Sequence, residues 1–132
     1  MLSPLAACGI LETEDEIADE ARVVVSGTAS NPLLLITTTK FERFYDEEGE
    51  AQTTVVVADT VTIDPAAGYD HVYPVKPDKG FLVRLVNPET ETAVVSIQVY
   101  FDGELSYDQK NVSLSDASLE FSYIFENFNT VY

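Results

Sequence analysis

The chain has 132 residues, of which 45% are hydrophobic, and its 23 acidic and 7 basic side chains give a formal net charge of -16. This length is typical of one domain with a single core, and the recurrence of Val, Ile, Thr, Tyr and Phe is typical of a β protein. A surface this acidic repels phosphate backbones and anionic lipid headgroups, which argues against nucleic-acid binding and against electrostatic binding to membranes.

The N-terminal segment is dominated by carboxylates. Residues 12–20, ETEDEIADE, carry no basic side chain, and the first basic residue of the chain is Arg22. Like charges at this density repel each other and favour an extended, solvated segment, so we predict a flexible acidic tether over residues 9–20. The competing interpretation is an amphipathic helix, whose apolar face would be narrow and formed by Ile10, Leu11, Ile17 and Ala18.

From Arg22 onward, short apolar or alternating runs are separated by Gly, Pro, Asn and Asp. This spacing is typical of an antiparallel sandwich or barrel. We predict an immunoglobulin-like β-sandwich of seven or eight strands over residues 21–132. The expected strands are 22–28, 33–44, 52–63, 71–75, 81–86, 92–101, 104–109 and 118–125.

Alternation within these runs predicts which side chains face the core, because successive residues of a strand point to opposite faces. Polar or charged residues such as Arg84 and Glu120 interrupt the apolar series at every second position. The expected inward sets are Phe81, Val83 and Leu85; Val95, Ile97, Val99 and Phe101; and Leu119, Phe121, Tyr123 and Phe125.

The hairpin at Asp102-Gly103 needs an extra residue to keep apolar side chains on one face. A two-residue loop followed by strict alternation would put Leu105 opposite Tyr100, away from the core. We therefore predict a three-residue loop of Phe101, Asp102 and Gly103, with Gly103 in a left-handed conformation and Leu105 facing Val99.

Candidate chemistry is sparse in this sequence. The acidic turn of Asp46, Glu47, Glu48 and Glu50 is the best candidate for a cation site, although its spacing matches no known calcium loop and a solvated hairpin end is favoured. His71 is the only histidine, and we expect it to pack against neighbours and not to act in catalysis. Asp102 and Glu104 form a carboxylate pair that we expect to be solvated. The sequence predicts no enzyme, cofactor or metal site.

Three tyrosines do not fit the alternating core positions. Tyr69 and Tyr73 flank His71, and Tyr100 falls on the outward parity of its strand. Exposed tyrosines are enriched at protein interfaces, so these residues are candidates for partner contact. The C-terminal segment FENFNTVY, residues 125–132, is a second candidate, as a strand that pairs with a neighbouring sheet edge.

The only cysteine of the chain is Cys8, in the sequence Leu5-Ala6-Ala7-Cys8-Gly9. This segment resembles the lipobox of bacterial lipoproteins, in which a small apolar tripeptide precedes the cysteine that receives the lipid. The resemblance implies that residues 1–8 end a signal region whose start lies upstream of Met1, and that Cys8 is the site of lipid attachment. Because Gly9 is not the aspartate associated with inner-membrane retention, it further implies the outer membrane or the cell surface.

These observations predict a non-catalytic, lipid-anchored protein of the bacterial cell envelope. Its small β-sandwich would present loops or a sheet face to a binding partner, at the end of an acidic tether. The alternative is a subunit of a surface filament or a similar assembly, joined by strand addition through a terminal segment. Under both hypotheses the expected partners are a membrane, reached through the lipid on Cys8, or a protein, and no nucleic acid.

Overall fold

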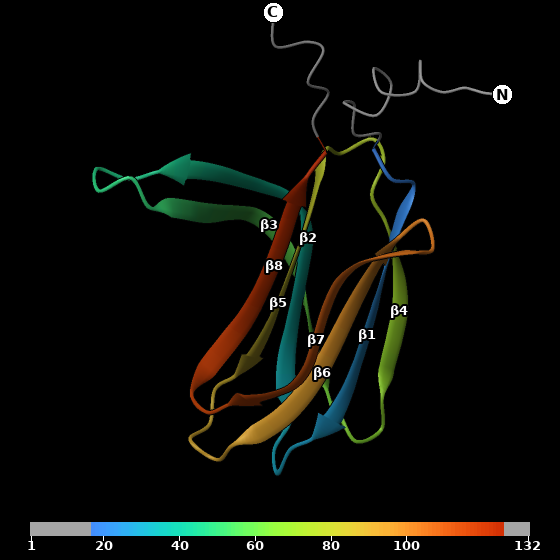
Figure 1. Cartoon of the computed structure of the whole chain (residues 1–132), viewed down its shortest axis with the longest axis vertical. Coiled ribbons are helices and arrows are strands. Elements are labelled where there is room, and N and C mark those ends of the chain that lie inside the picture. The colour runs from blue at the N-terminus through green and yellow to red at the C-terminus, as the bar shows by residue number, and fades with distance from the viewer. Residues whose placement is uncertain (1–16, 126–132) are drawn as a thin grey trace, which may run out of the picture.

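Eight strands and no helix make up the part of the chain described here, residues 17–125 of a computed structural model (Figure 1). All eight lie within a residue or two of the positions expected from the sequence, except that β7 continues five residues further. The strands are β1 (Glu20–Thr28), β2 (Leu33–Tyr45), β3 (Ala51–Ile63), β4 (Tyr69–Pro74), β5 (Gly80–Asn87), β6 (Ala93–Phe101), β7 (Glu104–Leu114) and β8 (Ala117–Ile124).

Two four-stranded antiparallel sheets pack face to face, in the orders β4-β1-β6-β7 and β3-β2-β5-β8. The predicted fold class, an antiparallel sandwich of the immunoglobulin-like kind with seven or eight strands, is confirmed. Only the β2–β3 and β6–β7 connections join neighbours within a sheet, and the other connections cross between the sheets. The strand order differs from that of an antibody constant domain. There the first strand lies beside the second, whereas here β1 lies between β4 and β6.

The core lies between the sheets and follows the predicted alternation. Along β6, Val95, Ile97 and Val99 are at most 2% exposed, whereas Val94, which points to the outer face of the sheet, is 37% exposed. The inward residues of β5 are buried in the same way. Those of β8 are only partly buried as far as Tyr123, because β8 is the outermost strand of its sheet.

One polar side chain, Asn87, is completely buried at the end of β5. Its amide donates hydrogen bonds to the backbone oxygens of Glu91 and Leu114, each at 2.8 Å, and its Oδ1 accepts one from the N–H of Glu89 at 3.1 Å. A buried polar group is tolerated when its hydrogen bonds are satisfied. Asn87 therefore fastens the β5–β6 loop and the end of β7 to one point of the core.

The packed domain begins earlier than expected from the charge pattern. Ala18 is 4% exposed within the core cluster and Ile17 packs against it. The last residues of the predicted tether thus belong to the sandwich, since Ala18 buries its methyl group and Glu20 already pairs with Pro74 of β4. Positions 9–16 of the tether prediction lie outside the described residues.

The β6–β7 hairpin differs from the prediction in an informative way. Gly103 has the expected positive φ of 84°, but Asp102 is also left-handed at 51°, and Phe101 pairs with Glu104. The loop therefore has two residues, with the positive φ angles of the type I′ turn, which matches the twist of the flanking strands. The three-residue loop is wrong. The extra residue lies in the strand instead, where the register shifts between Tyr100 and Val99.

Candidate functional site

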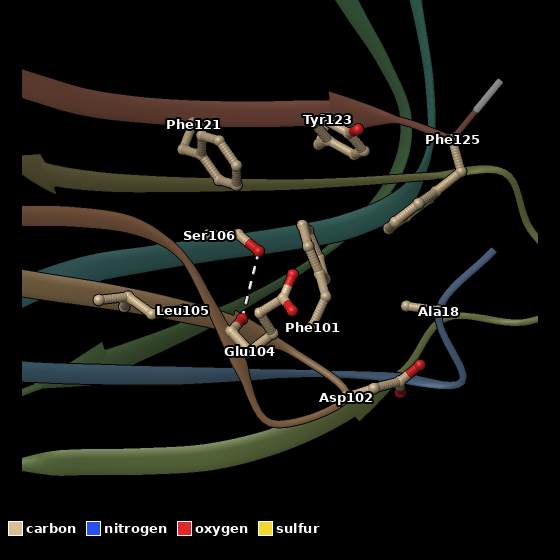
Figure 2. A pocket seen from close by; sticks show the side chains of 9 residues that line it. All are labelled: Ala18, Phe101, Asp102, Glu104, Leu105, Ser106, Phe121, Tyr123 and Phe125. Atoms are coloured by element: carbon tan, nitrogen blue, oxygen red, sulfur yellow. Dashed lines mark hydrogen bonds between the residues drawn. The ribbon is translucent and has the colours of Figure 1, made fainter. Parts of the chain in front are cut away.

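A pocket of about 580 Å³ opens between the two sheets at the β6–β7 hairpin. One wall is the hairpin, and the other is the end of β8 together with Phe125 (Figure 2). The lining combines aromatic rings with two carboxylates and is formed by Ala18, Phe101, Asp102, Glu104, Leu105, Ser106, Phe121, Tyr123 and Phe125.

The register of the hairpin explains why this space is not filled by apolar side chains. Phe101 faces the core and pairs with Glu104, so Glu104 occupies an inward position where a hydrophobic residue would close the sheets. Leu105 pairs with Tyr100 and is 46% exposed, so it does not fill this space. After the register shift Tyr107 pairs with Val99 and faces inward again. The pocket therefore occupies the part of β7 that precedes the shift.

Phe121, one of the residues that line the pocket, belongs to a stacked pair of rings. Tyr107 of β7 and Phe121 of β8 lie 4.4 Å apart between ring centroids with an interplanar angle of 17°. This contact bridges the two outermost strands, which share no ladder of hydrogen bonds. Burial raises the pKa of the Tyr107 hydroxyl, in keeping with its place between the sheets.

Asp102 connects the hairpin to the beginning of β1. Its carboxylate accepts hydrogen bonds from the backbone N–H of Asp19 at 3.0 Å and of Glu20 at 3.1 Å. In return, the N–H of Asp102 donates to the backbone oxygen of Glu20 at 3.1 Å. The two carboxylates, which were predicted to be solvated, therefore differ in role. Asp102 holds the start of β1, and Glu104 faces the pocket.

We expect Asp102→Ala to lower the free energy of unfolding by about 1–2 kcal/mol, because it removes two hydrogen bonds and places an alanine at a positive φ. Glu104→Ala is the matched control, since it removes a neighbouring carboxylate for which no hydrogen bond to the described residues is seen. It should change stability by about 0.5 kcal/mol or less. Urea unfolding monitored by tyrosine fluorescence measures both. Equal losses in the two variants would contradict the structural role of Asp102.

Phe121→Ala should cost about 1–2 kcal/mol, below the cost of truncating a fully buried phenylalanine, because Phe121 is only partly buried and lines the pocket. The loss comes mainly from its stacking on Tyr107. Glu120→Ala, on the opposite face, breaks the ion pair of Glu120 with Arg84. Both side chains of this pair are about one-third exposed (30% and 33%), so the loss of unfolding free energy should be less than about 1 kcal/mol. Urea melts in which Glu120→Ala is the more damaging change would show that the inward face of β8 is assigned wrongly.

A second feature is the outer half of the β2–β3 hairpin, which we call the arm: residues 40–45 of β2, the turn 46–50 and residues 51–57 of β3. β2 pairs with β5 only from Leu34 to Thr38, so beyond Thr38 the strands β2 and β3 pair only with each other. The register shifts at this point, and the arm bends away and projects from the sandwich (Figure 1). Bulges of this kind increase the local bend and twist of a hairpin.

The arm exposes an unusual number of large apolar side chains. Phe44 is 49% exposed, Tyr45 71%, Val56 62% and Val57 59%. Phe44 and Tyr45 are consecutive in a strand and so lie on opposite faces of the ribbon. A two-stranded ribbon is only marginally stable by itself in water, so apolar side chains exposed on both of its faces offer a contact surface to another molecule.

Side chains at the root of the arm hold its direction. The hydroxyl of Thr39 donates to the Asp78 carboxylate at 2.6 Å, and the ammonium of Lys40 lies 3.0 Å from the same group. These two hydrogen bonds, that of Thr39 first, hold the pKa of Asp78 below its ordinary value. The ring of Phe41 covers Gly80, where a β-carbon would stand only 2.9 Å from it. The arm is therefore attached to the β4–β5 loop as well as to its own strands.

The predicted cation candidate forms the turn at the tip of the arm. Asp46 lies there with Glu47, Glu48 and Glu50, and its carboxylate accepts hydrogen bonds from the N–H of Glu48 and of Glu50 and from the amide of Gln52. These bonds, that from Glu50 first, hold the pKa of Asp46 below its ordinary value. Within residues 17–125 no group of three or more His, Cys, Asp or Glu side chains is arranged to hold a metal ion.

His71 and its neighbouring tyrosines form a row along β4. The His71 ring lies 4.7 Å from that of Tyr73 and 6.1 Å from that of Tyr69, and the two tyrosine hydroxyls share a hydrogen bond. Burial, then the hydrogen bond with Tyr69, raises the pKa of Tyr73. Both tyrosines pack against the core, so the expectation that they are exposed is wrong. Tyr100 is half-buried on the outer face, where the Arg22 guanidinium lies 5.6 Å from its ring.

In comparisons with protein-family models, curated protein sequences and solved structures, nothing matches this chain. Cys8 and its lipobox-like context, and residues 126–132 of the C-terminal segment, lie outside the described residues. Within residues 17–125 there is no helix of the length and hydropathy needed to cross a bilayer.

Proposed function

We propose that this protein is a non-catalytic, lipid-anchored component of the bacterial cell envelope that binds a protein partner through the arm. The observation that carries the proposal is the exposure of Phe44, Tyr45, Val56 and Val57 on a ribbon that leaves the sandwich. Apolar side chains held away from the domain's own core contribute little to its stability, and a partner surface would remove them from water.

The attachment of the arm supports a role in recognition. A loop that merely extended from the domain would lose much conformational entropy on binding, whereas an arm held by Asp78 and Phe41 is already ordered. The acidic turn at its tip adds charge that can steer a basic partner toward the apolar ribbon. The lipobox resemblance at Cys8 supports attachment to a membrane, and the acidic segment that follows it would separate the domain from the membrane surface.

A photo-crosslinking residue in place of Tyr45, introduced into the full-length protein in its native cells, tests the arm. We expect one discrete cross-linked protein from this position. A crosslinker at Glu89, in the exposed loop at the other end of β5, is the matched control and should give none. A Phe44→Ser, Val57→Ser variant should lose the product while keeping its unfolding midpoint, and retention of the product would contradict the proposal.

The anchor is tested separately. A lipid on Cys8 predicts that Cys8→Ser moves the protein from the membrane fraction to the soluble fraction, and that mass spectrometry finds the modified cysteine at the mature N-terminus. Recovery of an unmodified Met1 from native cells would end the lipid part of the proposal and leave the arm untouched.

The alternative, a subunit of a surface assembly, is favoured by one observation. Beyond Thr38 the arm has a hydrogen-bonded neighbour on one side of each strand only, and such edges can accept a strand from another subunit. Light scattering over a wide concentration range separates the two functions. Growing oligomers that disappear in the Phe44→Ser, Val57→Ser variant would favour the assembly, and a constant monomer would exclude it.

A further inference from the structure

The pocket at the β6–β7 hairpin has aromatic walls. Phe101 lies at its centre, with ring centroids 4.9 Å from Phe125, 5.7 Å from Tyr123 and 6.2 Å from Phe121 (Figure 2). Aromatic faces carry negative charge density and attract cations at distances up to about 6 Å from the ring centroid. They also bury the methylene stems of long basic side chains.

The charge of the lining has one sign. Asp102 and Glu104 contribute carboxylates, and none of the nine lining residues is a lysine or an arginine. Asp102 is partly compensated by the backbone N–H groups of Asp19 and Glu20, whereas the carboxylate of Glu104 meets no ion-pair partner among the described residues. The Glu104 side chain is exposed to solvent, so an incoming cation can reach its carboxylate, and Figure 2 shows it beside Phe101.

We propose that this pocket binds a lysine or arginine side chain of a partner polypeptide. Its aromatic rings would surround the apolar stem, and Glu104 would pair with the charged head. The formal net charge of -16 raises the local concentration of basic segments and disfavours a second copy of this chain as the occupant. The inference does not rest on the arm, which lies on the β2–β3 hairpin, so either proposal can fail without the other.

Chemical-shift changes in the NMR spectrum of the full-length, uniformly labelled protein provide the test. The probes are N-acetyl-lysine amide and N-acetyl-arginine amide, with N-acetyl-norleucine amide as the uncharged partner of the lysine stem. We expect saturable shifts confined to residues around Phe101, Glu104 and Tyr123, with millimolar affinity for the basic probes. Norleucine should bind about five-fold more weakly or not at all.

Two variants separate the pocket from general attraction to an acidic surface. Glu104→Gln keeps the shape of the side chain and should weaken lysine binding about five-fold, whereas Glu89→Gln removes a charge at the other end of the domain and should change nothing. Shifts scattered over many carboxylates, equal binding of norleucine and lysine, full binding by Glu104→Gln, or no saturable shift would each overturn the proposal.

Discussion

Truncation of Phe81 to alanine should lower the free energy of unfolding by about 3–5 kcal/mol, a large part of the 5–15 kcal/mol that stabilises a typical domain. Phe81 is 1% exposed on β5, a strand flanked by β2 and β8. Its ring lies between those of Tyr73 from the opposite sheet and Phe101, at centroid distances of 6.0 and 6.1 Å. The substitution removes both ring contacts and leaves a cavity in the core between the two sheets.

Phe44→Ala makes the same chemical change on the arm, where the ring is 49% exposed, and should cost less than about 1 kcal/mol. Urea denaturation at constant pH measures both variants, and the slope of the transition should stay unchanged. A similar midpoint for the two variants would mean that Phe81 is not a central element of the core.

Gly27→Ala should cost about 2–4 kcal/mol, although it adds a single methyl group. Gly27 has a φ of 143°, which side chains of L-residues rarely adopt. A β-carbon there would lie 2.1 Å from the backbone oxygen of Val94, so β1 and β6 would have to separate where they pair. The variant should therefore lose protection from hydrogen exchange at both strands as well as stability.

Gly68→Ala separates the clash from the backbone conformation. Gly68 also has a positive φ, 80°, but no atom outside Gly68 and its two chain neighbours lies within 4 Å of the position of its β-carbon. This variant should cost only about 1–2 kcal/mol, from the left-handed conformation itself. If it proved as damaging as Gly27→Ala in thermal unfolding, crowding against Val94 would not be the cause.

Much of the fold follows from local patterns. Alternation identifies the strands and their inward faces because the pleat puts every second residue on one side, as in Val95, Ile97 and Val99. The end of β7 is less visible in the sequence, because Asn111 adopts a positive φ of 54° and donates its N–H to the Ser96 hydroxyl at 3.0 Å. A bulge of this kind interrupts the alternation, so the strand expected at 104–109 ends five residues before β7 does.

The candidate sites were harder to predict, since both depend on register and on contacts between distant segments. The length of the two runs that form β2 and β3 was visible, but nothing in the sequence shows that β5 pairs with β2 only as far as Thr38. Likewise, the acidic surroundings of Ala18 hide its burial, which depends on Asp102, 84 residues later in the chain. Side-chain hydrogen bonds across such separations have no local signature.

The hairpin after β6 also has a consequence for how this chain could change in evolution. Deletion of Glu104 alone would let Leu105 pair with Phe101 and Ser106 with Tyr100, while Tyr107 keeps its present partner Val99. The ladder would become regular, and a leucine would replace the carboxylate on the inner face. The loss of a single codon would therefore exchange an open, charged pocket for a closed core. One deletion separates the two forms of the domain.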